Sequence, residues 1–384
     1  MRVLVNGWFL QHPTTGTGQY VREILRHLPE VRPAWEIGVA LPEGWEGSLP
    51  SGVAPVILPR PPLPHPFDKV WFEQVTVPRA AARWRADRLF VPYWAPPLRA
   101  PAPVVVTVHD LIPLLFPEYR SHPGVRLYTA LALAATAGAA HVLTDSEASR
   151  RDILRRLGLP PGRVTAIPLG VDGRFNRRPD PVADARVWTR YDLPPAYVLY
   201  LGGFDRRKHI EGLLAVYRWA RDAVGEAFPL VIAGRLPEGS RRLWVDPRPL
   251  ARAWGLEEVV RYIGPVAEED KPALYRHAAA FLYPSRYEGF GLPVLEAMAC
   301  GTPVVASEIP ALAELVGDAA YLVPPEDPRA MAGALIAVLV DAALARTLRE
   351  RGPRRAAAFT WTACARRTAE ILEGLGGAST PAGG

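Results

Sequence analysis

One stretch, Ser285–Ser307, constrains the fold of this chain more than any other. A short apolar run over 279–283 precedes it and predicts a buried parallel strand. Pro293 suits the first turn of a helix and Gly301 suits the residue just past its end, so the sequence predicts a helix over 293–300. The apolar run 304–306 follows this helix and predicts the next strand. This order predicts a parallel α/β sheet, with the turn at the sheet's carboxyl edge, where such folds bind ligands.

The turn between strand and helix has the chemistry of an anion site. Glycines allow the backbone to approach a ligand closely, and the first N–H groups of a helix point outward at the positive end of its dipole. The N–H groups concerned belong to Phe290, Gly291 and Leu292. Glu296, in the first helical turn, suits a diol such as a ribose, and Glu288 stands at the strand exit. Together these residues predict a site for a phosphorylated sugar.

The same residues carry a resemblance to a known family. Glu288 and Glu296, with seven residues between them, lie within Glu-Gly-Phe-Gly-Leu-Pro-x-Leu-Glu-Ala-Met-Ala-Cys-Gly-x-Pro-Val. This string resembles the donor-site signature of retaining glycosyltransferases of the large family 4. The resemblance implies an α/β protein with the GT-B fold, in which two Rossmann-like, doubly wound parallel-sheet domains face each other across a cleft. It covers nearly the whole chain, and its specific motifs lie in the C-terminal half.

The length of 384 residues independently favours two domains. The resemblance places an N-terminal acceptor-side Rossmann-like domain at 1–172, a C-terminal nucleotide-sugar-binding Rossmann-like domain at 196–355, and a helix at 356–373 that packs back on the first domain. Four prolines predict a linker at 173–195, and a composition rich in Gly, Ala, Ser and Pro predicts a disordered tail at 374–384.

Charge, cysteine content and hydropathy indicate the cellular location of the protein and the kinds of partner it binds. The net charge is +6, and 42 of the 45 basic residues are arginines spread along the chain, which favours a GC-rich genome over a specific anionic partner. The two cysteines, Cys300 and Cys364, predict neither a disulfide framework nor a metal site. No leader and no apolar run of about 18 residues is present. We therefore expect a cytoplasmic protein, soluble or peripheral on the inner face of the membrane, with no nucleic-acid partner.

The first glycine-rich loop lies near the N-terminus. Gly16 and Gly18 precede a helical pattern over 19–28, and a dinucleotide-binding fingerprint would need a third glycine at Val21, so a nicotinamide cofactor is not predicted. In the family that the chain resembles, this loop helps to seat the acceptor or the donor phosphate. A plain flexible turn is the alternative.

Polar residues also follow the predicted strands of the N-terminal half. Val104–Val108 ends in His109 and Asp110, at a carboxyl edge where a ligand is expected. The resemblance implies that His109 faces the transferred sugar, where it hydrogen-bonds a hydroxyl or supports the developing positive charge, with Asp110 on the acceptor side. Tyr93 follows the strand 89–91 and suits stacking on a sugar, although buried aromatic residues are commoner than ligand platforms.

The second half opens with a strand over 197–201 and the sequence Gly-Gly-Phe-Asp-Arg-Arg-Lys-His. In the resembled family a basic pair at this place neutralises the donor pyrophosphate, and Arg207 and Lys208 match it. Many members have a further arginine where this chain has Gly203, and glycine or asparagine where it has His209. A surface charge cluster is the alternative interpretation of the pair.

The nucleotide base is expected further along the chain. Similar enzymes place it beside the segment that holds Val266, Glu268 and Lys271, although a helix start rich in acids has the same composition. No Asp-x-Asp metal motif is present, so the resemblance implies transfer without a bound divalent ion and without a cofactor. The cations of the basic pair would then meet the charge of the departing nucleoside diphosphate.

Trp71 and the basic residues between 67 and 88 predict a surface element that either touches a membrane or presents a solvated arginine face. For the whole chain we expect a metal-independent retaining transferase that moves a mannose- or glucose-type hexose from GDP- or UDP-hexose to a saccharide or lipid-linked acceptor. A nucleotide-sugar epimerase and a non-catalytic sugar-nucleotide-binding subunit are the alternatives.

Overall fold

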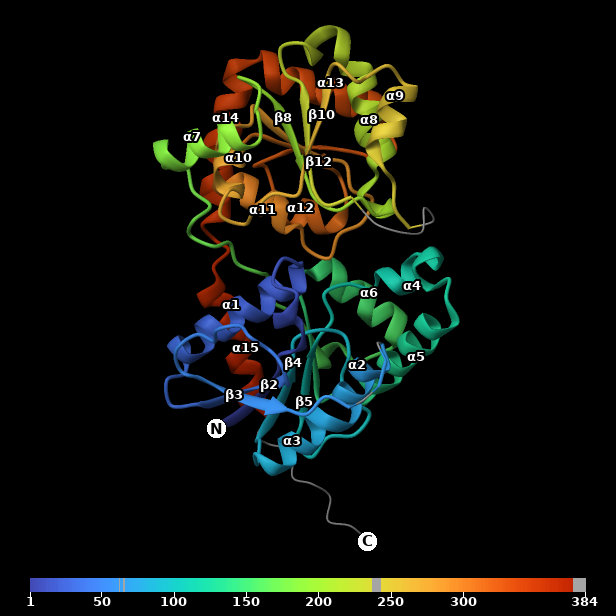
Figure 1. Ribbon diagram of the computed structural model, residues 1–384, viewed down its shortest axis with the longest axis vertical. Coiled ribbons are helices and arrows are strands. Elements are labelled where there is room, and N and C mark those ends of the chain that lie inside the picture. The colour runs from blue at the N-terminus through green and yellow to red at the C-terminus, as the bar shows by residue number, and fades with distance from the viewer. Residues whose placement is uncertain (62, 65, 237–242, 376–384) are drawn as a thin grey trace. The chain divides into compact units, whose positions relative to one another are not determined.

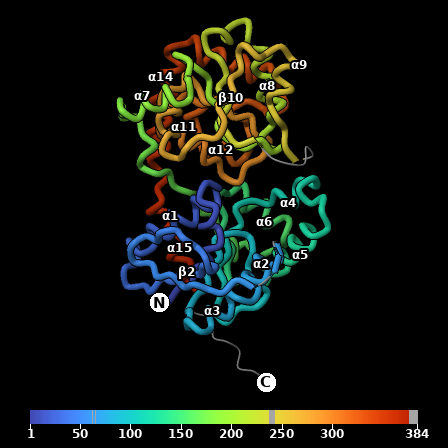
Figure 2. Tube along the Cα trace, viewed as in Figure 1, coloured from blue at the N-terminus to red at the C-terminus, as the bar shows by residue number. Residues whose placement is uncertain are grey.

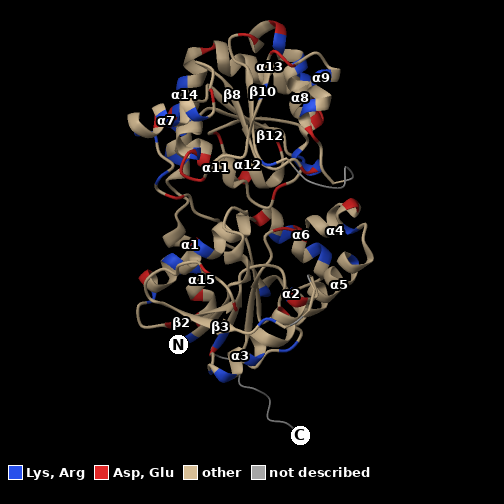
Figure 3. Cartoon of the chain, in the orientation of Figure 1, with Lys and Arg blue, Asp and Glu red and all other residues tan. Residues whose placement is uncertain are grey.

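Two compact units make up the chain in the computed structural model, which describes residues 1–61, 63–64, 66–236 and 243–375 (Figure 1). Unit 1 comprises Met1–Gly170 and Thr360–Gly384, and unit 2 comprises Val171–Phe359. Each unit holds one all-parallel sheet with helices packed around it (Figures 1 and 2). Basic residues are spread over both units, as the arginine distribution in the sequence predicts (Figure 3).

The sheet of unit 1 has seven strands in the order β3-β2-β1-β4-β5-β6-β7. Its strands are β1 Arg2–Asn6, β2 Glu36–Pro42, β3 Val53–Leu58, β4 Arg88–Val91, β5 Val104–Thr107, β6 His141–Thr144 and β7 Val164–Ala166. Its helices are α1 Gly16–Val31, α2 Phe67–Trp71, α3 Val77–Arg83, α4 Ile112–Leu115, α5 Pro123–Gly138, α6 Glu147–Leu157 and α15 Trp361–Gly374. Short turns of helix complete the unit: η1 Trp8–Gln11, η2 Phe72–Thr76, η3 Pro117–Arg120 and η4 Pro161–Arg163.

The sheet of unit 2 has six strands in the order β10-β9-β8-β11-β12-β13. Its strands are β8 Val198–Leu201, β9 Leu230–Ala233, β10 Val260–Gly264, β11 Ala280–Tyr283, β12 Val304–Ser307 and β13 Tyr321–Val323. Its helices are α7 Pro181–Arg190, α8 Ile210–Ala220, α9 Pro247–Ala253, α10 Lys271–His277, α11 Leu292–Ala299, α12 Pro310–Val316, α13 Pro328–Val340 and α14 Ala342–Ala356, with the short helical segments η5 Arg206–Lys208 and η6 Arg221–Gly225.

Both sheets reverse strand order once, between β1 and β4 and between β8 and β11. This is the doubly wound arrangement, whose ligand sites lie beyond the carboxyl ends of the strands at the reversal. The inner strands β8, β9, β11 and β12 are four residues long and fully buried, whereas β10 and β13 at the edges of the same sheet are only partly buried. The predicted pair of Rossmann-like sheets is confirmed.

Two connecting segments hold elements that the sequence did not predict. The proline-rich composition of 49–66 predicts an extended, solvent-facing segment; β3 within it is extended and exposes Ala54, Pro55 and Ile57, but it also pairs in register with β2. Pro55 is accommodated because β3 is an edge strand. The expected linker 173–195 belongs to unit 2 and holds α7, because Arg186 and Arg190 from this helix donate to the buried Asp270 at 2.6 and 3.0 Å.

The C-terminal helix α15 lies in unit 1, against α1. The side chain of Thr360 caps its first turn, and Arg88 Nε donates to the carbonyl of Leu372 at 2.8 Å. Residues 376–384 of the expected tail lie outside the described residues. In the part of the chain that the structure describes, no single helix is long and apolar enough to cross a bilayer, and one pair that meets at a 94° bend passes the same length and composition test together.

Candidate functional site

The carboxylate of Glu288 is the centre of a buried polar cluster in unit 2. It follows β11, and the short helix η5 after β8 brings two cations to it. Lys208 Nζ and Ser285 Oγ each donate to Oε1 at 2.6 Å, and the hydroxyl of Tyr283 donates to the same oxygen at 3.0 Å. Arg207 Nη1 donates to Oε2 at 3.0 Å. Both carboxylate oxygens are therefore occupied by protein donors.

Charge in this cluster is fixed by the two cations. Burial alone would raise the pKa of Glu288, but Lys208 and Arg207 lower that pKa to about 2. Arg207 is held in turn by Asp205, whose Oδ1 lies 3.0 Å from its Nε. The Glu288 side chain is 8% exposed and stays ionised at neutral pH. It is an anchor for the basic pair and is not protonated to act as a general acid.

The helix α11 begins beside this cluster. Its N-cap is Gly291, which offers no side-chain cap, so its first N–H groups have no intrahelical acceptor. The backbone of Gly291 has φ +112°, and a Cβ there would lie 2.5 Å from Leu312. Phe290 is buried and packs edge-on against Phe359. The turn thus needs glycine at 291, as the sequence pattern predicts.

Glu296 points into the interior from α11. Its Oε2 accepts from the hydroxyl of Tyr275 at 3.0 Å, and burial raises its pKa to about 7 against the lowering effect of Lys271. Lys271 Nζ lies 2.5 Å from Glu268 Oε1, and Arg174 donates to Glu268 Oε2 at 3.3 Å. The structure therefore brings Glu268, Lys271 and Glu296 into one electrostatic neighbourhood. Arg174 joins them without having been predicted.

Gly203 and Val266, two other residues of the predicted donor site, have local contacts or partial burial. The carbonyl of Gly203 accepts from the hydroxyl of Tyr200 at 2.6 Å, and Val266 is half-buried. His209, where the family pattern has glycine or asparagine, adopts the left-handed conformation with φ +55° as the N-cap of α8. A left-handed backbone favours glycine and asparagine, which gives the family pattern a structural reason.

His109 is the centre of a second cluster, in unit 1. Its Nδ1 lies 2.8 Å from Asp145 Oδ2, and its Nε2 is buried with no hydrogen-bond partner among the described residues. Burial lowers the pKa of His109, but Asp145 outweighs it and the pKa is raised. Tyr20 packs edge-on against the ring at 4.8 Å. Asp145 therefore fixes the orientation of the ring, and the backbone of Pro92 also contributes to the raised pKa of His109.

The remaining predicted residues of unit 1 have local structural contacts. Asp110 Oδ1 accepts from the N–H of Ile112 at 3.0 Å, at the start of α4. The Thr15 side chain accepts from the N–H of Gly18, and a Cβ at Gly18 would lie 2.1 Å from the carbonyl oxygen of His12. Gly16 begins α1, earlier than the predicted start at Gln19, and has open space around its Cα. Their ligand roles stay predictions.

Tyr93 belongs to a network that the sequence did not reveal. It is 4% exposed and packs edge-on against Phe9 at 4.7 Å, which leaves little of its ring free for stacking on a sugar. Lys69 Nζ lies 2.6 Å from the buried Glu73 and 2.7 Å from the hydroxyl of Tyr128. Burial raises the pKa of Glu73. Tyr93 and Tyr128 are far in sequence from Lys69 and Glu73, and only the fold brings them to this pair.

Asp145, by contrast, has a signal in the sequence. It directly follows β6, and β6 pairs with β5, the strand that leads to His109. Carboxyl ends of neighbouring parallel strands meet at one edge, so strand order alone places Asp145 near His109. Among the described residues, no group of three or more histidine, cysteine, aspartate or glutamate side chains is arranged to hold a metal ion.

Comparison with known proteins identifies the family. The family model for glycosyl transferases group 1 matches residues 189–355, and that for glycosyltransferase family 4 matches residues 14–174. The O-antigen chain mannosyltransferase B of Escherichia coli is 30% identical over 376 residues, which cover 94% of this chain and 96% of that protein.

Solved structures share the fold. Sucrose-phosphate synthase from Thermosynechococcus elongatus superposes with a TM-score of 0.78 at 24% identity, covering 99% of this chain and all of that one. Anabaena HepE in complex with UDP-glucose superposes with a TM-score of 0.75 at 20% identity, covering 97% of this chain and all of that one. The chain belongs to glycosyltransferase family 4 and has the GT-B fold.

Proposed function

We propose that this glycosyltransferase is a retaining hexosyltransferase, which moves a mannose- or glucose-type hexose from a GDP- or UDP-hexose to a saccharide or lipid-linked acceptor. The observation that carries the proposal is the cluster of Arg207 and Lys208 around Glu288, beside the uncapped start of α11. Two similar proteins support it: one is named as an O-antigen chain mannosyltransferase, and the other was solved with UDP-glucose.

Arg207 and Lys208 bind the donor pyrophosphate in this proposal. A guanidinium, an ammonium and the helix N-terminus all favour an anion, and they stabilise most strongly the charge that develops on the leaving diphosphate. The reaction therefore needs no divalent metal and no cofactor. Glu296 accepts from the ribose hydroxyls, and Val266, Glu268 and Lys271 contact the base.

The transfer step breaks the bond between the sugar's anomeric carbon and the diphosphate oxygen, and forms a bond from that carbon to the acceptor oxygen. The acceptor's proton passes to the departing phosphate oxygen on the same face, so the anomeric configuration is retained. His109 donates from Nε2 to a hydroxyl of the transferred sugar; its raised pKa favours this role over contact with a developing positive charge.

Glu288 serves mainly as a positioning residue. Its two oxygens already accept four hydrogen bonds from protein groups, two of them from the cations that face the donor. Orientation of the sugar hydroxyls by Glu288, implied by the family resemblance, requires one of these bonds to be exchanged when the donor binds. A place in the cytoplasm, in contact with the inner face of the membrane when the acceptor is lipid-linked, is part of the same proposal.

A thermal-shift panel of UDP, GDP, ADP and dTDP, each with magnesium and with EDTA, tests the donor class. We expect UDP or GDP to raise the melting temperature equally with and without the metal, since a ligand at 100 times its Kd stabilises the folded state by about 2.7 kcal/mol. No shift with any nucleotide, or a shift that needs magnesium, contradicts the proposal.

Product analysis separates the transferase from its alternatives. With the matching nucleotide hexose, an added acceptor and NMR of the anomeric proton, we expect consumption of donor that depends on the acceptor, and a product of unchanged anomeric configuration. Turnover of the donor into a second nucleotide sugar without acceptor indicates an epimerase. A donor that binds tightly and is never consumed indicates a binding subunit.

A further inference from the structure

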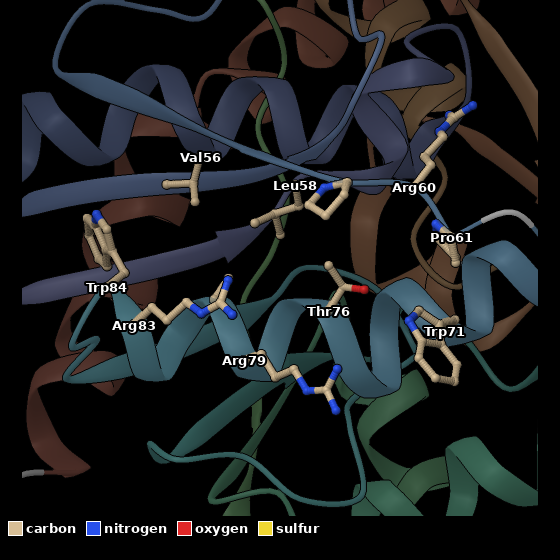
Figure 4. Close-up of a pocket in the computed structure, with 11 residues that line it drawn as sticks. Val56, Leu58, Arg60, Pro61, Trp71, Thr76, Arg79, Arg83 and Trp84 are labelled. Atoms are coloured by element: carbon tan, nitrogen blue, oxygen red, sulfur yellow. The ribbon is translucent and has the colours of Figure 1, made fainter.

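A groove on unit 1 lies between the edge strand β3 and the helical segment that runs from α2 to α3 (Figure 4). Its volume is about 420 Å³. Trp84 and Trp71 lie at its two ends, with Arg83 and Arg79 between them along the helix (Figure 4). The strand side is formed by Val56, Leu58, Pro59, Arg60 and Pro61, and the remaining lining residues are Thr76 and Ala80.

The apolar part of the groove suits a hydrocarbon chain. Val56 and Leu58 face it from β3, and Ala80 faces it from α3. Trp71 is 43% exposed and Phe67, one helical turn before it, is 64% exposed, so two large apolar side chains lie uncovered on the same helical segment. A ligand that covers this surface gains hydrophobic stabilisation that the free protein lacks.

The charged part of the groove lacks a counter-charge. Three arginines line it, and none of its lining residues is acidic. Arg60 donates to Gln11 and lies over the Trp8 ring at 5.7 Å. Arg79 and Arg83, four residues apart on one face of α3, have no hydrogen-bond or ion-pair partner among the described residues. Like charges at this spacing destabilise a helix, and a bound anion relieves the repulsion.

We propose that this groove binds a phosphate monoester on an apolar chain, with the phosphate between Arg79 and Arg83 and the chain along Trp71, Leu58 and Val56. Guanidinium groups match phosphate oxygens in a paired geometry, which favours phosphate over a neutral head group. The groove lies in unit 1, and Arg207, Lys208 and Glu296 of the proposed donor site lie in unit 2. The inference therefore stands whichever sugar nucleotide the enzyme uses.

Calorimetric titration of the full chain with decyl phosphate, kept below its micelle-forming concentration, tests the proposal. We expect saturable binding at one site, at least tenfold weaker for inorganic phosphate and for decanol. The double variant Arg79→Gln/Arg83→Gln should bind decyl phosphate at least tenfold more weakly, and Trp71→Ala should also weaken it. The matched control is Arg26→Gln/Arg354→Gln, which removes the same charge from exposed arginines outside the groove and should bind as the parent does.

Three results would overturn the proposal: no saturable binding of decyl phosphate, equal loss in both double variants, or unchanged affinity in the groove variant. Vesicles of phosphatidylglycerol and phosphatidylcholine distinguish the source of the phosphate. Binding to vesicles without binding to monomeric decyl phosphate would show a membrane-contact surface in place of a site for one molecule. Nucleotide thermal shifts measured on the same variants show whether they are folded, and these shifts should match those of the parent chain.

Discussion

At the scale of single residues, Lys208 gives the sharpest test of the donor site. Lys208 is 7% exposed, and its ammonium donates hydrogen bonds to Glu288 and to the hydroxyl of Tyr283. We expect Lys208→Met to lose a charge-assisted hydrogen bond to the donor diphosphate, worth about 1.5–3 kcal/mol, or about tenfold to a hundredfold in affinity. Calorimetric titration of Lys208→Met and of the parent, with the nucleoside diphosphate and with the bare nucleoside, measures this loss of affinity. An equal loss for both ligands would contradict a role at the phosphates.

Glu296 makes stability depend on pH. Its pKa of about 7 lies above the ordinary glutamate value, so the folded state binds this proton more tightly than the unfolded state does. The stabilisation is therefore complete below about pH 4.5 and is lost as the pH rises through 7. We expect the parent chain to lose up to about 3 kcal/mol relative to Glu296→Gln between pH 5 and pH 8, measured by urea unfolding.

The exposed Glu370→Gln variant is the control for this measurement, and its stability relative to the parent should stay constant over the same range. A constant difference between the parent and Glu296→Gln would show that Glu296 is ionised throughout, and that burial does not govern its pKa.

The pair of His109 and Asp145 predicts a second titration. Because Asp145 raises the pKa of His109, Asp145→Asn should lower that pKa, and the imidazolium should disappear at a lower pH. NMR of the imidazole Cε1 proton follows His109 directly, with His109→Ala to assign the signal. If the pKa of His109 is the same in Asp145→Asn and in the parent, the 2.8 Å contact does not hold the ring's charge.

At the scale of elements, the start of α11 depends on one glycine. Gly291→Ala places a Cβ 2.5 Å from Leu312 at a φ of +112°, which costs about 1–3 kcal/mol of stability and tilts the N–H groups away from the phosphate. Gly333→Ala is the matched change inside α13, where a Cβ meets nothing within 4 Å. It should stabilise the fold by about 0.5–1 kcal/mol. Urea unfolding compares the two, and an equal effect would contradict strain at Gly291.

The sequence predicts well those elements whose ends are marked by proline or glycine. The unit of β11, α11 and β12 follows from Pro284, Pro293 and Gly301, and the structure agrees within one residue at each end of the helix. The strand β3 was missed because Pro55 argues against a strand, whereas an edge position tolerates it. The helix α7 was missed because the prolines of 173–195 suggest a linker, although Asp180 caps the helix and Pro181 is its first residue.

Residues of the candidate sites could likewise be predicted where a local motif determines their geometry, and could not where packing brings them together. Arg207, Lys208 and Glu288 could be predicted because each lies in a short motif whose neighbours set its geometry. The contact of Glu73 with Lys69 is local, but its burial beside Tyr93 and Tyr128 depends on how η2 packs on the sheet. Such packing is a property of the folded unit, and no pattern along the chain encodes it.

At the scale of the whole molecule, the two units carry different parts of the proposed reaction. The chain passes between them after Gly170 and again after Phe359, so unit 2 is one continuous segment and unit 1 is built from two. Unit 2 contains the groups proposed to hold the donor nucleotide, and unit 1 contains His109. Substitutions at the proposed donor site of unit 2 should therefore lower nucleotide affinity, and substitution of His109 in unit 1 should lower turnover.

His109→Ala tests this division. The variant should bind the nucleoside diphosphate within about twofold of the parent, because unit 2 supplies those contacts. Its turnover with donor and acceptor should fall about tenfold to a hundredfold, the value of one hydrogen bond to a charged donor. Calorimetry and initial rates, measured beside Lys208→Met, give the comparison: Lys208→Met loses nucleotide affinity and His109→Ala keeps it. If His109→Ala loses nucleotide affinity as strongly as Lys208→Met, His109 acts on the nucleotide itself and its assignment to the transferred sugar is wrong.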